Sequence, residues 1–569
     1  MKIDISKLGY RWKGHYSSTQ TYTKGDVVRK DGKVLAWTGA DWKQWAADQQ
    51  NATASGELAT PDEGQTLTGI EGQELYVSGA NTLEWRYTKG RKVAAAVKLP
   101  EQRYGGDCSQ FGGPQGFALM TDGTIRAWGR NNNGALGDGV DADRHRTRAT
   151  SVAFPPYAPP MVKMWRGWYN FFSLDTNGQL WAWGYNNVGQ CGVGNTSNVT
   201  VPVMISGRGD LPLNDKVVDV HCATGYYGYN FTLVRTENGR VYHMGYNRYG
   251  VAGCNHSNNN SVPTLCQISA KYPIKKMFAF GHYHAGSFLI DEQGRMWCAG
   301  EQNTIGRVQN NDNPNTIHEL WTQSEFDPVK VVYGEESDEH VNAGSQYYRQ
   351  YMIISEAGNV YSWGHGSTYS SGTNNISDNT YGTTETWVPK LDSRISDAVS
   401  GGVGAGWYHM ALVVKSDGTM WGIGNNQDSV LGYYGGTNSS WGRVDPGNLG
   451  LSYKEIFVRS GRHGKSAAGL TTDGRVVHWG MSGPGQQGNG YNSNEPTNGA
   501  AMLPGYVDMS EGYLERFNYS GWTDDGDCYQ VCHAIIGDGN VYGWGHNGYA
   551  QVGSDDDQEN VFVPTPVIL

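Results

Sequence analysis

Short apolar runs alternate with polar turns along most of this chain. The runs Phe117–Met120 and Ile125–Trp128 flank the turn Thr121-Asp-Gly-Thr124. Glycine supplies the positive φ that a tight turn needs, so two apolar runs around such a turn predict a β-hairpin. The pattern predicts eight hairpins, whose turn glycines are Gly123, Gly178, Gly239, Gly294, Gly358, Gly418, Gly474 and Gly539.

A second glycine follows each turn glycine at a fixed distance. It comes six residues later, and in five repeats a tryptophan directly precedes it. The tryptophan is large enough to fill the gap between stacked sheets, and the glycine lets a neighbouring backbone approach closely. We therefore expect a structural role for Gly123, Trp128, Gly129, Gly178, Trp183, Gly184, Gly474, Trp479, Gly480, Gly539, Trp544 and Gly545.

The period of the repeat predicts the fold. Successive turn glycines are 55 to 65 residues apart, which leaves room for about four short strands in each repeat. Radial repetition of small antiparallel sheets is the architecture of a β-propeller. We expect an all-β chain in which residues 92–569 form a propeller of eight four-stranded blades, with seven blades as the alternative. Pairing of the apolar run Val561–Leu569 with a strand from the N-terminal side would close the ring.

The repeated pattern resembles that of the regulator of chromosome condensation family. The best matches are Asp122–Gly137, Asn177–Gly192, Asn238–Gly253, Asp473–Gly488 and Asp538–Gly553. The resemblance covers roughly residues 101–569 and implies a propeller, which in that family usually has seven blades. The family often carries a histidine in G-x-x-H, which His284 and His409 match here. Because these histidines recur at near-equivalent positions, we expect structural hydrogen bonds from them rather than catalysis.

Composition and charge narrow the classes of partner. The chain has 80 glycines, 17% charged residues and a mean hydropathy of −0.56, which is typical of turn-rich all-β proteins and common in extracellular or virion proteins. Its net charge is −11, whereas a protein that grips nucleic-acid phosphates normally has a basic patch. The densest basic cluster is Arg144–Arg148, which we interpret as a solvated loop. We therefore expect no nucleic-acid partner.

The chain shows no sign of a metal site, a cofactor or a membrane span. Its eight cysteines are scattered, and Cys528-x-x-x-Cys532 is their only close pair. Zinc sites need four ligands in compact pairs, so we expect buried free thiols, with a Cys528–Cys532 disulfide as a minor alternative. No apolar run approaches 18 residues, and the N-terminus has no hydrophobic signal region. These features predict synthesis in a host cytoplasm without membrane insertion.

The first 91 residues lack the repeat. Residues 1–48 predict a small β-module with strands Asp26–Arg29 and Val34–Trp37, and residues 49–91 a linker with short β segments. The module resembles chitin-binding type-three modules and segments of phage tail-fibre proteins. Aromatic rings in such modules stack on sugars, so the candidate glycan-binding residues are Tyr16, Tyr22, Trp42 and Trp45. The alternative is that these rings form the core of the module.

No catalytic motif appears, since neither H-E-x-x-H nor G-x-S-x-G occurs. We therefore expect a non-enzymatic protein. The leading hypothesis is a structural virion protein of a bacteriophage, a tail fibre or appendage component of the phage tail. Its partners would be other tail proteins and a host-surface receptor or glycan, and it could form a homo-oligomer. The alternatives are a glycan-binding or glycan-degrading protein, and an interaction scaffold or guanine-nucleotide exchange factor.

Overall fold

The chain divides into two compact units, Met1–Ala95 and Ala96–Leu569. The computed structural model describes eight strands among the first 98 residues and then residues 115–167, 169–223, 230–248, 250–254, 256–281, 285–300, 318–321, 327–341, 344–364, 386–404, 410–426, 429–432, 437–461, 464–474, 476–480, 514–524, 527–536, 540–554 and 560–569.

The first unit contains two small sheets. One has the order β2-β3-β4-β5, with strands Arg11–His15, Asp26–Lys30, Lys33–Trp37 and Trp42–Gln44. The antiparallel pairing of β3 with β4 confirms the hairpin predicted for this segment. The other sheet has the order β1-β7-β6, with strands Lys2–Asp4, Thr82–Tyr87 and Gln73–Gly79.

The described strands of the second unit form eight antiparallel sheets, which we number as blades 1 to 8. Blades 1 to 4 are β8–β11 (Ala96–Lys98, Gln115–Met120, Ile125–Arg130, His145–Ser151), β12–β15 (Met161–Arg166, Asn170–Asp175, Leu180–Gly184, Val199–Met204), β16–β19 (Val217–Ala223, Phe231–Thr236, Val241–Gly245, Asn260–Leu265) and β20–β23 (Ile274–Gly281, Ala285–Asp291, Met296–Gly300, His318–Trp321). The helix α1 (Gln267–Lys271) lies between blades 3 and 4.

Blades 5 to 8 continue the same order. They are β24–β27 (Val329–Val341, Gly344–Ser355, Val360–Gly364, Thr386–Leu391), β28–β31 (Ala398–Gly404, Met410–Lys415, Met420–Asn425, Thr437–Val444), β32–β34 (Tyr453–Gly461, Gly464–Thr471, Val476–Gly480) and β35–β38 (Leu514–Asp524, Asp527–Ile536, Asn540–His546, Asn560–Pro566). Within the described residues, blade 7 has three strands and every other blade has four.

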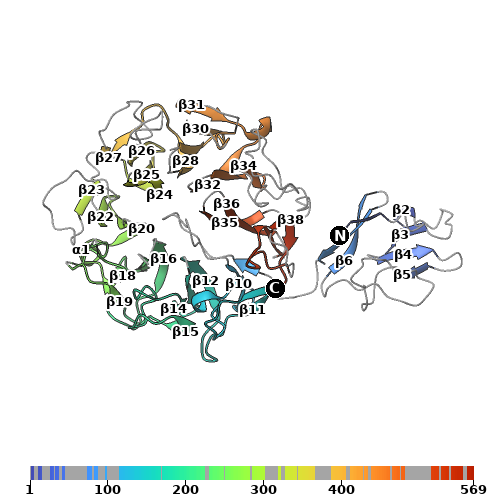
Figure 1. Ribbon diagram of the computed structural model, residues 1–569, viewed down its shortest axis with the longest axis horizontal. Coiled ribbons are helices and arrows are strands. Elements are labelled where there is room, and N and C mark those ends of the chain that lie inside the picture. The colour runs from blue at the N-terminus through green and yellow to red at the C-terminus, as the bar shows by residue number, and fades with distance from the viewer. Residues whose placement is uncertain are drawn as a thin grey trace. The chain divides into compact units, whose positions relative to one another are not determined.

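The blades surround a common axis, with the first strand of each blade on the inside (Figure 1). Within each sheet the spatial order of the strands follows the chain order. This arrangement confirms the predicted all-β propeller, with eight sheets rather than seven.

The ring closes through a contact that recurs between blades. The carbonyl six residues after the repeated second glycine accepts a hydrogen bond from the next blade. The donor and acceptor pairs are Trp183 Nε1 to Ala135 O (3.0 Å), Thr232 Oγ1 to Gln190 O (3.1 Å), Ser287 Oγ to Val251 O (2.7 Å), Trp479 Nε1 to Val430 O (2.6 Å) and Trp128 Nε1 to Gln551 O (2.8 Å). The last of these bonds joins blade 1 to blade 8.

The predicted closure by strand exchange is therefore wrong. Among the residues that the structure describes, β38 pairs with β37, and no strand from the N-terminal side enters that sheet. The chain end instead contacts the outer strand of blade 1, where Ala149 N–H donates to Ile568 O at 3.1 Å. Each blade can complete its own sheet because a repeat already supplies the strands it needs. Closure of the ring therefore requires only side-chain contacts and single backbone hydrogen bonds between blades 8 and 1.

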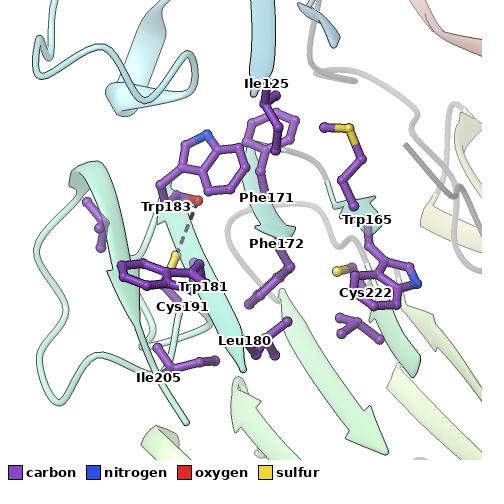
Figure 2. Packing of buried hydrophobic residues seen from close by; sticks show 14 of the residues in the cluster. Ile125, Trp165, Phe171, Phe172, Leu180, Trp181, Trp183, Cys191, Ile205 and Cys222 are labelled. Atoms are coloured by element: carbon purple, nitrogen blue, oxygen red, sulfur yellow. Dashed lines mark hydrogen bonds between the residues drawn. The ribbon is translucent and has the colours of Figure 1, made fainter. Parts of the chain in front are cut away.

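The repeated tryptophans form the core between blades. Trp128, Trp183, Trp479 and Trp544 are buried. Figure 2 shows Trp183 beside Phe171, with ring centroids 5.8 Å apart, and Cys191, whose thiol donates to Trp183 O at 3.7 Å. The cysteines that the structure describes are free and buried, as predicted: Cys191, Cys222, Cys254, Cys266 and Cys298.

The glycine after the tryptophan is required by a close backbone contact. Gly184 has a φ of +97°, and a Cβ placed there would lie 2.0 Å from Tyr169 O. The asparagine two residues later also has a structural role. Asn186 Oδ1 accepts a hydrogen bond from Cys191 N (2.9 Å), and Asn426 Oδ1 accepts one from Leu431 N (2.7 Å). The residues of the repeated motif therefore have structural roles within and between the blades.

Candidate interaction surface

The predicted glycan-binding residues stay a prediction. Trp42 begins β5, but its side chain is outside the described part of the structure, as are Tyr16, Tyr22 and Trp45. Among the repeat residues, Gly539 is also outside it, and so are His284 and His409.

The basic cluster Arg144–Arg148 is not a loop, contrary to the prediction, because His145 begins β11. Arg144 and Arg146 both pair with the Asp138 carboxylate, at 3.1 and 2.9 Å. Burial alone would raise the pKa of Asp138, but hydrogen bonds led by that from Arg146 outweigh it and lower the pKa. Two of the three arginines in this short cluster are thus held by one carboxylate, which leaves them less available to a nucleic-acid phosphate.

One face of the propeller collects the turns and the connections between blades. Because neighbouring strands are antiparallel, the turn between the second and third strands lies at the same end as the connection to the next blade. Backbone bonds join the two: at five connections the first residue of the next blade donates to the turn glycine carbonyl. These pairs are Met161 to Gly123, Val217 to Gly178, Ile274 to Gly239, Ala398 to Gly358 and Tyr453 to Gly418, at 2.9 to 3.1 Å. We call this face the turn face.

The turn face carries most of the exposed large apolar side chains. Tyr157, Leu213 and Leu449 lie on connections between blades, and Leu391 is the last residue of β27, where such a connection starts. Their exposed fractions are 78%, 53%, 41% and 50%, respectively. Of the two other exposed large apolar residues in the described part of the chain, Val162 is the second residue of β12, at the same face. Exposed apolar residues gathered on one face indicate a binding surface.

Tyr157 is held in a rigid turn. Ala158 N–H donates to Pro155 O at 2.9 Å, which closes a turn with Pro156 and Tyr157 at its corners. Pro159 and Pro160 follow directly. Since proline fixes φ, a partner that binds the Tyr157 ring would lose little conformational entropy in this loop. The proline pairs on both sides of the tyrosine are the sequence signal for this residue, which the repeat pattern alone does not single out.

The base of this loop packs on buried aromatic rings. Phe154 meets Trp181 edge-on at 5.9 Å, and the Tyr157 ring lies 6.3 Å from Trp181. Trp181 is anchored in turn, because its Nε1 donates to Asp175 Oδ2 at 2.9 Å. The exposed tyrosine is therefore supported by rings that belong to the blade core.

A second aromatic group occupies the equivalent place on blade 4. Tyr272 stacks on Trp297 with ring centroids 4.9 Å apart and an interplanar angle of 17°. The Arg295 guanidinium lies 4.2 Å from the Tyr272 ring centroid, and its Nε donates to Asp291 Oδ2 at 2.7 Å. Stacked rings beside a held arginine are typical of protein-binding surfaces.

A cysteine and a histidine lie close together between the third and fourth strands of blade 3. Cys254 Sγ lies 3.1 Å from His256 Nε2, but burial raises the pKa of the Cys254 thiol, and a neutral thiol is a weak nucleophile. In the part of the chain that the structure describes, no three histidine, cysteine or acidic side chains gather as metal ligands would. The helices in that part are all too short or too polar to span a membrane.

Comparison with known proteins supports the repeat assignment. The family model for the regulator of chromosome condensation (RCC1) repeat matches residues 177–228 and 538–569, and a second model with the same description matches residues 224–251. The predicted family resemblance is thus confirmed for these repeats, while the resemblance of the N-terminal module is untested.

Several proteins share part of the chain. The ultraviolet-B receptor UVR8 of Arabidopsis thaliana is 24% identical over 391 residues, which are 66% of this chain and 80% of the receptor. The human E3 ubiquitin-protein ligase HERC2 is 26% identical over 251 residues, 44% of this chain but 5% of the ligase. The crystal structure of human WBSCR16 covers 69% of this chain and 94% of its own at 18% identity, with a TM-score of 0.47.

Proposed function

We propose that this chain is a non-enzymatic interaction scaffold whose propeller binds a partner protein through the turn face. The observation that carries this proposal is the placement of Tyr157, Leu213, Leu391 and Leu449 on connections of one face. The Trp-Gly pairs of the repeated motif are buried in the blades, so the turns and connections are the part of the propeller left to recognise a partner.

Two comparisons agree with a binding role. UVR8 is named as a receptor, and the match to HERC2 covers a small part of a protein named as a ligase. The part of HERC2 that resembles this chain is small enough that ligase activity does not come with the resemblance. A propeller that recurs in proteins of different activity favours recognition as its own contribution.

Site-specific photo-cross-linking tests this function. A benzophenone amino acid would replace Tyr157 in the full chain, expressed in its native cell, and a matched variant would carry it at Thr196, which is exposed on the loop between the third and fourth strands of blade 2. We expect a discrete cross-linked protein at Tyr157 that is absent at Thr196. Equal products at both positions, or none at Tyr157, would overturn the proposal.

The guanine-nucleotide exchange hypothesis is a narrower form of the same idea. If the partner is a small GTPase, the full chain should accelerate release of a fluorescent nucleotide, and the Tyr157→Ala variant should lose that effect. Acceleration that survives in Tyr157→Ala would place the contact elsewhere.

The bacteriophage tail hypothesis stays a prediction. It rests on sequence patterns in the first 91 residues, whose side chains lie outside the described residues, and on the glycine-rich polar composition, the lack of a hydrophobic signal region and the lack of catalytic motifs. Mass spectrometry of purified virions tests it, and failure to find this chain would defeat it. The glycan hypothesis rests on the same segment and is tested by a glycan array.

A further inference from the structure

The inner strands carry a repeated irregularity at the turn face. In each of blades 2 to 7 the first strand shifts register by one residue next to its start, as between Met161 and Lys163 or between Ile274 and Lys276. Such a bulge leaves one residue unpaired in the ladder. The bulge places two adjacent residues of every inner strand, the first strand of its blade, beside the central axis at the turn face.

Lysines are concentrated at these two positions. They are Lys163 on blade 2, Lys275 and Lys276 on blade 4, Lys330 on blade 5 and Lys454 on blade 7. We call these five residues the inner rim. Lys98 and Arg516 hold the same register position on β8 and β35, and Glu515 holds the unpaired position on β35.

The inner rim is built into the structure, because its ammonium groups reach from blade to blade. Lys276 Nζ donates to Lys330 O on blade 5 at 2.9 Å, and Lys330 Nζ donates to Val399 O on blade 6 at 3.1 Å. Lys163 Nζ makes the corresponding contact to Val218 O on blade 3 at 3.5 Å. In each bond the acceptor is the carbonyl of the unpaired residue in the next inner strand. The lysines therefore lie around the central axis at the turn face.

One carboxylate of the chain lies against this rim. Lys276 Nζ donates to Glu356 Oε1 at 2.8 Å, and that bond lowers the pKa of Glu356. Lys275 and Lys330 are close enough to lower it further by charge attraction. Lys276 thus pairs with this carboxylate, the charges of Lys275 and Lys330 act on it as well, and Lys275 remains exposed to solvent.

The local charge opposes that of the whole chain. Over the eight blades these two positions carry seven basic residues, the five rim lysines with Lys98 and Arg516, and three acidic residues, Asp219, Glu455 and Glu515. With Glu356 beside Lys276 as a fourth carboxylate, three positive charges remain. The whole chain carries −11. A positive site attracts anions from solution, whereas the negative net charge of the chain repels other copies of it.

We propose that the inner rim binds an acidic peptide segment of the partner protein, with carboxylates of that segment pairing with Lys275, Lys276, Lys330 and Lys454. A peptide fits better than a small anion because these lysines lie on three different blades, and an extended chain can present several carboxylates to them. The proposal rests on the proposed function, and it identifies the chemistry that the partner would bring to the turn face.

The test uses the full chain and a fluorescein-labelled octaglutamate peptide, followed by fluorescence anisotropy. We expect binding that weakens as salt rises, and no binding of an octaglutamine peptide. In the Lys275→Gln/Lys454→Gln variant, which removes two exposed lysines, the Kd should rise about tenfold. The control Lys216→Gln/Lys271→Gln removes the same charge from exposed lysines of the turn face outside the rim.

Three results would overturn the proposal. They are equal affinity of the rim variant and the native chain, an equal loss in the control variant, and binding of tripolyphosphate without binding of octaglutamate. Circular dichroism melting checks that both variants are folded. Because the peptide is synthetic, this test does not depend on finding the partner. Cross-linking at Tyr157 with no peptide binding would refute the rim alone, and peptide binding with no cross-link would refute the proposed use of the apolar connections.

Discussion

The seam between blades 8 and 1 allows a direct test of how the ring is held together. Trp128 is buried there, its Nε1 donates to Gln551 O at 2.8 Å, and its ring meets that of His533 edge-on at 5.4 Å. His533 Nε2 lies 2.9 Å from the same carbonyl. The substitution Trp128→Phe removes the indole donor and part of the ring, but His533 can still satisfy Gln551 O.

The cost can be compared with the same change inside the ring. Trp183 is the equivalent residue between blades 1 and 2, and its Nε1 donates to Ala135 O at 3.0 Å. Losing a buried hydrogen bond costs about 1 kcal/mol, and the smaller ring costs about 1–2 kcal/mol more. We expect Trp128→Phe to lose about 2–3 kcal/mol. Trp183→Phe should lose about 1 kcal/mol more, because Ala135 O loses its side-chain donor.

Urea unfolding followed by far-ultraviolet circular dichroism measures both variants. The double variant Trp128→Phe/His533→Ala should cost more than the sum of its single variants, since it leaves Gln551 O without either donor. If Trp128→Phe proves more destabilising than Trp183→Phe, carbonyl pairing is not the deciding term. The covalent connection between blades 1 and 2 would then be what protects that interface.

Three further predictions concern the scaffold. Deleting 567–569 removes buried Val567 and three backbone bonds, so the unfolding free energy should fall by about 2 kcal/mol after chain entropy is subtracted, and an unchanged thermal melt would contradict this. Burial lowers the pKa values of His478 and His533 from 6.5 to about 3 and about 4. Below pH 6.5 the unfolded chain therefore binds more protons than the folded chain, so urea midpoints should decrease from pH 6.5 to about 3.5. A flat profile would refute the burial of these two histidines in their neutral form. In urea unfolding, Gly184→Ala should cost more than about 3 kcal/mol because its Cβ would contact Tyr169 O. Gly450→Ala has open space around its Cβ and a φ of +62°, so it should cost about 1–2 kcal/mol. Equal losses would show that the backbone angle alone decides the cost.

The repeated pattern was sufficient to predict the scaffold. A turn glycine and a Trp-Gly pair at a fixed distance are local features, and each sets the conformation of residues close to it in the chain. Gly123 and Gly184, for instance, both have positive φ, and Trp183 is buried against the preceding blade. Because the period leaves room for one small sheet, counting the repeats predicted the number of sheets.

The binding surface could be located only in three dimensions. Nothing near Tyr157 in the chain says that Leu213 and Leu391 lie on the same face, since that depends on the alternation of strand direction through several blades. The five lysines of the inner rim are likewise up to 291 residues apart, from Lys163 to Lys454. Their sequence context is that of ordinary strand residues, and it is the packing of the inner strands around one axis that places them together.

The mode of ring closure was also decided by tertiary structure. The sequence indicated correctly that a propeller must join its ends. An apolar C-terminal run, however, is compatible both with strand exchange and with side-chain contact. Which of them occurs depends on whether blade 8 finds its strands within its own repeat. It does, because β35 to β38 pair in chain order, and Trp128 then closes the ring through Gln551 O.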